Sequence, residues 1–152
     1  KIEGATFEEV KNRVLAAEFG GGAILAEGFL KSLSEYLQPE ILRCEKPIES
    51  EEAILGYKNL NKLIEDFTYT VKKQISSSEG APREAWLNLA IFLEIITPLA
   101  KLYLEFSKGN YDMSLLEKTI DTAYNYREKL RDVFDVYLFE NVIRRIKYFK
   151  NI

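Results

Sequence analysis

Histidine is absent from this sequence of 152 residues, and cysteine occurs once, as Cys44. Histidine is the side chain that titrates nearest neutral pH, and it is the commonest protein ligand for metals. Its absence excludes Ser-His-Asp and Cys-His nucleophiles, histidine-containing zinc sites and the Glu-x-x-His di-iron bundle. A single cysteine excludes an internal disulfide and thiolate zinc sites, which favours a reducing compartment. We therefore expect a cytoplasmic protein with no catalytic, cofactor-binding or metal-ligating residues.

An excess of one charge is also missing, because 21 basic and 24 acidic residues give a net charge of −3. This balance provides no field that would attract the whole molecule to nucleic acid or anionic lipid, so either ligand would need a local patch. Residues 1–19 are amphipathic and carry acidic side chains, unlike a secretory signal peptide. Hydrophobic residues make up 47% of the chain. We expect one ordered domain over residues 1–152.

Apolar residues recur at intervals of three and four along most of the chain, which is the period of an amphipathic α-helix. The most regular stretch follows Ser50, a predicted N-cap, and extends from Glu51 to Ile75. A loop is predicted over Ser76–Gly80. The next helix is predicted from Glu84 to Lys108, with Gly109 as its C-terminal stop. Both helical segments are far longer than ordinary strands.

Two shorter helices are predicted before Pro39. The first begins at Thr6, which has capping-box spacing to Glu9. Its apolar stripe consists of Phe7, Val10, Val14 and Ala17. The second helix has the stripe Leu25, Phe29, Leu33 and Tyr36, together with Leu30 and Leu37. A connector with one helical turn around Ile41 and Leu42 is predicted after Pro39.

The triple glycine Gly20–Gly22 lies between the two short helices. A glycine-rich turn before a helix can expose backbone amides to a phosphate. This one lacks both the Gly-Lys-Ser/Thr signature and the preceding strand of a phosphate-binding loop. We therefore interpret it as a hinge or a place of close packing.

The C-terminal part begins with a second capping box, Ser114 with Glu117. Neither glycine nor proline occurs from Leu115 to Ile152, so this segment forms either one helix or two, and the sequence leaves the choice open. The apolar stripe changes its phase near Val133–Phe139. We predict a bend, a break or a region contacted on several sides there.

These segments together predict an all-α, single-domain helical bundle of five or six helices with long antiparallel helices. The segment from Glu84 to Lys108 is apolar on nearly all sides, so we expect it to be central. One narrow polar edge consists of Glu94, Thr97, Lys101, Glu105 and Lys108. Pro98 is expected to kink this helix. Ionisable groups within the apolar run argue against a membrane span, so no membrane partner is expected.

Glu94 is the one acidic residue whose surroundings predict burial, and a salt bridge or exposure on the polar edge explains it better than catalysis. Two further acidic pairs, Glu65 with Asp66 and Glu117 with Asp121, would suit hard cations such as Mg²⁺. The paired Glu-x-x-Glu and Glu-x-x-Asp helices of all-carboxylate hydrolases are missing. A carboxylate-dependent metal or phosphate enzyme is therefore a further alternative only.

A basic segment near the end of the chain contains Arg144, Arg145, Lys147, Tyr148 and Lys150. Cations beside aromatic rings can follow a phosphate backbone and stack on bases. Basic residues also suit a helix C-terminus, where they offset the helix dipole. These five residues are candidate contacts for a nucleic acid or a protein partner.

The leading functional hypothesis is a non-catalytic interaction or assembly subunit, self-associating or part of a larger complex. Abundant aromatic residues and the change of stripe near the end of the chain favour it, since both are typical of helix-packing interfaces. The alternative is a nucleic-acid-associated helical module that uses the basic C-terminal segment. We expect the chain to have no enzymatic activity of its own.

Overall fold

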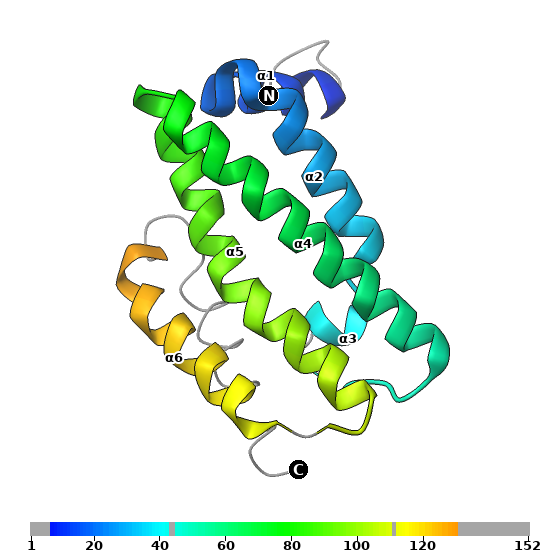
Figure 1. Cartoon of the computed structure of the whole chain (residues 1–152). Coiled ribbons are helices and arrows are strands. Elements are labelled where there is room, and N and C mark those ends of the chain that lie inside the picture. The colour runs from blue at the N-terminus through cyan, green and yellow to red at the C-terminus, as the bar shows by residue number, and fades with distance from the viewer. Residues whose placement is uncertain (1–6, 43–44, 111, 131–152) are drawn as a thin grey trace.

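The computed structural model describes residues 7–42, 45–110 and 112–130, and every structural statement concerns these ranges. The predicted all-α fold class is confirmed, because these residues form helices and no strand (Figure 1). In chain order the elements are α1 (Phe7–Phe19), the 3-10 turn η1 (Gly20–Gly22), α2 (Ala23–Tyr36), α3 (Pro39–Leu42), α4 (Glu51–Ser77), α5 (Gly80–Ser107) and α6 (Met113–Leu130).

Helix α4 follows the sequence prediction closely. The Ser50 hydroxyl accepts a hydrogen bond from the Ala53 amide at 3.1 Å, which confirms the predicted N-cap. The apolar stripe supplies the buried residues Tyr57, Leu60, Ile64, Phe67 and Val71. This face packs against α5, and the two helices lie side by side (Figure 1).

The predicted loop over Ser76–Gly80 is wrong in its length. Helix α4 continues through Ser77 and α5 begins at Gly80, so only residues 78–79 separate the two helices. The hydroxyls of Ser76 and Ser77 donate to carbonyls of the preceding turn at 3.1 Å, and these bonds fit both serines into the helix. Gly80 has a φ of +62°, a left-handed conformation that glycine adopts without a steric penalty.

Helix α5 packs against α1, α3, α4 and α6, as its apolar composition predicts. On the predicted polar edge, Glu94, Lys101 and Lys108 are exposed while Thr97 and Glu105 are half-buried. The polar edge is therefore confirmed. Glu94 is not buried, and the alternative expected for it, exposure on this edge, is confirmed. The α-helix continues through the buried Pro98 without a break.

Helix α5 stops where the sequence predicted. Gly109 follows its end with a φ of +81°. The amide of Gly109 donates to the Phe106 carbonyl at 3.0 Å. This left-handed residue satisfies one of the carbonyls that a helix terminus leaves without a partner.

The apolar stripe predicted for α1 is on the wrong face. Val10, Val14 and Ala17 are exposed, while Leu15 and Phe19 are buried. Both faces of α1 carry apolar residues, and the packing of α1 on α5 determines which of them enters the core. The sequence periodicity of a single short helix does not contain that information.

Helix α2 confirms its stripe only in part. Phe29 and Leu33 are buried as predicted, and Ala26 joins them. Leu25, Leu30 and Tyr36 are exposed, and Leu37 is half-buried. Helix α2 packs on α4 and α1, and these contacts bury a narrower face than the predicted one.

The connector after α2 is held by buried tyrosines. Helix α3 supplies the predicted single turn, with Ile41 in the core. The Tyr57 hydroxyl donates to the Glu40 carboxylate and accepts from the Ile48 amide at 3.1 Å. The Tyr103 hydroxyl lies 3.0 Å from the Glu40 carbonyl oxygen. Burial, and then the bond to Glu40, raise the pKa of Tyr57 far above its usual value.

The N-cap of α6 is Asp112, so the predicted capping box at Ser114 is wrong. Asp112 Oδ1 accepts from the Ser114 amide at 2.9 Å and from the Ser114 hydroxyl at 2.6 Å. These bonds lower the pKa of the Asp112 carboxyl. A carboxylate placed before the first turn also interacts favourably with the helix dipole. The bend predicted over Val133–Phe139 lies outside the described residues.

Candidate functional site

The basic candidates from the sequence lie outside the described residues. They are Arg144, Arg145, Lys147, Tyr148 and Lys150. Cys44 also lies outside. The candidates that the structure does place are the triple glycine, the paired acids and Glu94.

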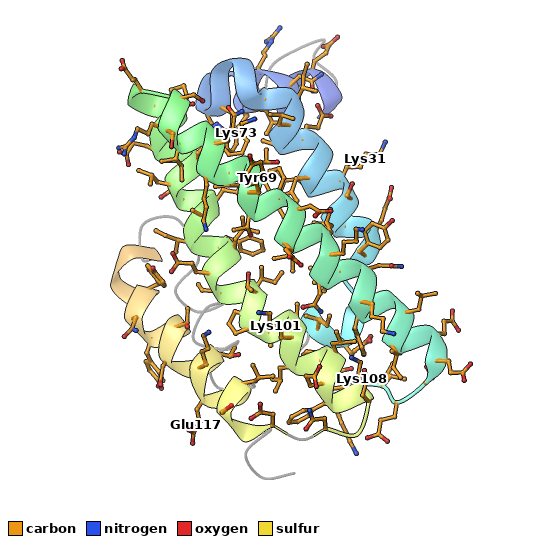
Figure 2. All side chains as sticks on the ribbon, in the orientation of Figure 1. Lys31, Tyr69, Lys73, Lys101, Lys108 and Glu117 are labelled. Atoms are coloured by element: carbon orange, nitrogen blue, oxygen red, sulfur yellow. The ribbon has the colours of Figure 1, made fainter. Side chains whose placement is uncertain are left out.

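The paired acids do not form a metal site in the described part of the chain. Glu65, Asp66, Glu117 and Asp121 are all exposed. Figure 2 shows Glu117 on α6, away from the core. Within residues 7–42, 45–110 and 112–130, no three carboxylate or thiol side chains gather at a distance that could hold a metal ion.

The triple glycine is a place of close packing against α5. A Cβ atom on Gly22 would lie 2.7 Å from Cζ2 of Trp86, closer than real Cβ contacts allow. Gly20 has a φ of +56°, and a Cβ there would lie 3.3 Å from Cγ of Pro82. Gly21 faces open space. Two of the three glycines thus let the turn between α1 and α2 touch the start of α5.

Trp86 is the centre of an aromatic cluster beneath this turn. It is fully buried, and its ring centroid lies 5.0 Å from that of Phe19 and 6.1 Å from that of Phe67. Phe67 stacks on Phe29 at 3.8 Å. The cluster joins α1, α2, α4 and α5. Edge-to-face and stacked contacts add to the stabilisation from burial, so this end of the molecule is held firmly.

An apolar groove of about 640 Å³ lies beside the aromatic cluster, between α1, α2 and the first half of α5. Two glutamates are the only charged residues that line it, and Asn88 is its one other polar residue. The lining consists of Ala17, Glu18, Phe19, Leu30, Ala81, Glu84, Ala85, Asn88, Leu89 and Phe92. We call this surface the N-terminal groove.

Exposed apolar side chains occur on the two helices that line the N-terminal groove together with α5. They are Val10, Val14, Ile24, Leu25 and Leu30, and Leu30 itself lines the groove. Ile24 is 82% exposed, which leaves almost its whole side chain in water. Grouped exposed apolar residues typically mark an interaction surface. Sequence reasoning missed this surface because it assigned Val10, Val14 and Leu25 to the core.

A second, more polar cleft of about 380 Å³ lies between α4, α5 and α6. Its lining consists of Thr68, Val71, Lys72, Ala90, Leu93, Glu94, Thr97, Pro98, Lys118 and Thr122. We call it the three-helix cleft. Its floor is apolar, with Val71, Leu93 and Pro98 buried, and its charged side chains are exposed. The sequence pattern predicted that Glu94 and Thr97 share one face of α5. It did not predict that residues of α4 and α6 line the same cleft.

Glu94 connects α5 to α6 at this cleft. The Tyr126 hydroxyl donates to the Glu94 carboxylate, and this bond raises the pKa of Tyr126. The cationic side chains Lys72 and Lys118 form no ion pair within the described residues. The salt bridge that the sequence suggested for Glu94 is replaced by a tyrosine hydroxyl.

Helix α5 is long and apolar enough to cross a membrane, judged by length and composition alone, and no other described helix is. Core helices of water-soluble proteins meet the same criterion. Four other helices pack against α5, and its most buried residues include Trp86, Leu102 and Tyr103. Within its most apolar window of 18 residues, 39% is buried against the rest of the structure.

No protein-family model, curated protein or solved structure matches this chain. An all-α fold hosts many unrelated activities, so the fold class by itself assigns none. The features of the described residues that could bind a partner or ligand are the N-terminal groove and the three-helix cleft.

Proposed function

We propose that this chain is a non-catalytic interaction subunit that associates with a second copy of itself through the N-terminal groove. The observation that carries the proposal is an exposed apolar face on α1 directly beside an apolar groove on α5. Water around such a surface is released when a second apolar surface covers it. A helical partner with an apolar face of matching length fits the groove.

The exposed face of α1 has the dimensions that the groove requires. Val10, Val14 and Ala17 lie four and three residues apart, so they form one strip about 10 Å long. The groove extends along α5 from Ala81 to Phe92, which corresponds to about 16 Å of helix. The strip of one copy would therefore lie within the groove of another.

The charges beside the two surfaces are complementary. Arg13 is exposed at the edge of the strip on α1, and the charged residues that line the groove are Glu18 and Glu84. Ala17 belongs to the strip and also lines the groove. One two-fold axis near Ala17 would therefore bring both strips and both grooves into contact at once, as closed symmetric dimers require.

We also infer that the helices form a single bundle in which α4 and α5 are antiparallel. The support is the connection of residues 78–79 between them and the apolar core that both helices share. Short connections favour antiparallel neighbours in helical bundles.

The test is the mass of the chain in solution, measured by sedimentation over a range of protein concentrations. We expect a mass above the 17.6 kDa of one chain that falls towards this value on dilution. Val14→Glu should shift the population to the monomer, because it places a charge on the strip. Circular dichroism should stay unchanged, since Val14 is 50% exposed.

Leu55→Glu is the matched control, because Leu55 is 59% exposed on α4 and does not line the groove. This variant should keep the mass of the unmodified protein. A monomer at every concentration would overturn the proposal. Equal masses for Val14→Glu and the unmodified protein would show that the association uses another surface.

A further inference from the structure

The three-helix cleft combines an apolar floor with charges from three different helices. Val71 and Leu93 form the floor and are 1% and 2% exposed. Lys72 on α4, Glu94 on α5 and Lys118 on α6 line the same cleft. An apolar cavity with a few converging polar groups is the usual form of a small-molecule site. The volume of about 380 Å³ falls within the size range of such sites.

The threonines of the cleft present hydrogen-bond acceptors. Thr68, Thr97 and Thr122 each donate their hydroxyl hydrogen to a carbonyl of the preceding turn, at 2.7, 2.5 and 2.7 Å. Their oxygen atoms keep lone pairs for an external donor. Hydroxyl groups in this state cannot serve as donors to a ligand.

Glu94 adds acceptors to the lining of the cleft. Its carboxylate accepts the Tyr126 hydroxyl and has further lone pairs. Pro98 has no N–H, so it cannot donate to the Glu94 carbonyl as another residue would. Donors in the cleft are the ammonium groups of Lys72 and Lys118. The cleft thus offers cations at its edges and acceptors around Glu94 and Thr97.

We propose that the three-helix cleft binds a small organic monoanion with an apolar body and a hydroxyl group, such as a branched hydroxycarboxylate. Two lysines and one glutamate give the lining a charge of +1, which a single carboxylate balances. The lysines would hold the carboxylate, and the apolar body would cover Val71 and Leu93. The hydroxyl would donate to Glu94 or Thr97. This inference is independent of the association through the N-terminal groove.

The experiment is an amide chemical-shift titration by NMR of the full chain with 2-hydroxy-4-methylpentanoate. We expect saturable shifts at the cleft and weaker binding at higher salt, because ionic contacts with exposed lysines are screened. 4-Methylpentanoate, which lacks the hydroxyl, should bind more weakly. 4-Methylpentan-1-ol, which lacks the carboxylate, should bind most weakly of the three.

Lys72→Met and Lys118→Met should each weaken binding of the hydroxycarboxylate about threefold to tenfold, the effect of losing one exposed charged contact. Lys73→Met is the matched control, since it removes the same charge from the neighbouring position of α4. Figure 2 shows Lys73 near Tyr69, and its Nζ atom lies 5.9 Å from the centre of that ring. Lys73 does not line the cleft.

Three results would overturn the proposal. The first is the absence of saturable shifts with the hydroxycarboxylate. The second is equally tight binding of the uncharged alcohol. The third is equal weakening by Lys73→Met and Lys72→Met, which would mean that only the overall charge matters. Unchanged circular dichroism of each variant shows that its fold is intact.

Discussion

The replacement of Gly22 by alanine tests the contact that positions the first two helices. The new Cβ would lie 2.7 Å from Cζ2 and 3.1 Å from Nε1 of Trp86. Trp86 cannot easily move away, because it is fully buried against Phe19 and Phe67. We therefore expect the turn η1 to shift away from α5 in this variant.

The magnitude follows from two opposing effects. Overpacking a well-packed core typically costs about 1 to 3 kcal/mol. Replacing glycine by alanine in an accessible backbone conformation recovers about 0.4 to 1 kcal/mol, because the unfolded chain loses freedom. We expect Gly22→Ala to lower the free energy of unfolding by about 1.3 kcal/mol, the difference between the midpoints of these two ranges. For a chain of this size, the melting temperature should fall by about 3 to 5 °C.

The assay is urea unfolding followed by circular dichroism, with Gly21→Ala as the control. A Cβ on Gly21 meets no atom within 4 Å, so this neighbouring replacement should be neutral or stabilising. A shift of the midpoint without a change in slope would report stability alone. Equal stability of the Gly22→Ala and Gly21→Ala variants would refute the argument that close packing on Trp86 requires glycine.

Two other predictions concern titrating groups. Tyr57→Phe should cost about 1 to 3 kcal/mol, because it leaves the buried Glu40 carboxylate without its donor. Folding raises the pKa of Tyr57, so the stability that its protonated hydroxyl provides is fully present below the unfolded pKa of about 10 and is lost as pH rises towards the folded pKa. The loss of stability with rising alkaline pH should therefore be less steep in Tyr57→Phe. Equal steepness in both proteins would contradict this reasoning. The pKa of the Asp112 carboxyl, measured by NMR in the folded protein, should lie below its unfolded value of about 3.9. The stability that the ionised carboxyl provides is therefore present above the unfolded pKa and is lost as pH falls through the folded pKa. Ser114→Ala should move this midpoint upward because it removes the hydroxyl donor, and an unchanged midpoint would show that the Ser114 hydroxyl does not hold the carboxylate.

The candidate sites were only partly predictable from the sequence. The polar edge of α5 was predictable because Glu94 and Thr97 lie on one helix and their spacing fixes their common face. Lys72 and Lys118 come from α4 and α6, and no local pattern indicates that they line the same cleft. The N-terminal groove was not predicted because both faces of α1 carry apolar residues. The sequence pattern does not show which of these faces packs against α5 and which stays exposed.

The sequence by itself determined the helices and several of their ends, because these depend on neighbours within one turn. Ser50 caps α4, Gly109 terminates α5, and the stripe of α4 enters the core, all as the local pattern requires. The absence of histidine likewise excluded several chemistries before any fold was considered.

Tertiary structure decided which face of each short helix is buried and why the glycines are needed. Leu15 rather than Val14 enters the core because α5 covers that side of α1. Gly22 must lack a side chain because Trp86, far along the chain, occupies the space that a Cβ would need. Such contacts join residues distant in sequence, so their energies appear only when the helices pack together.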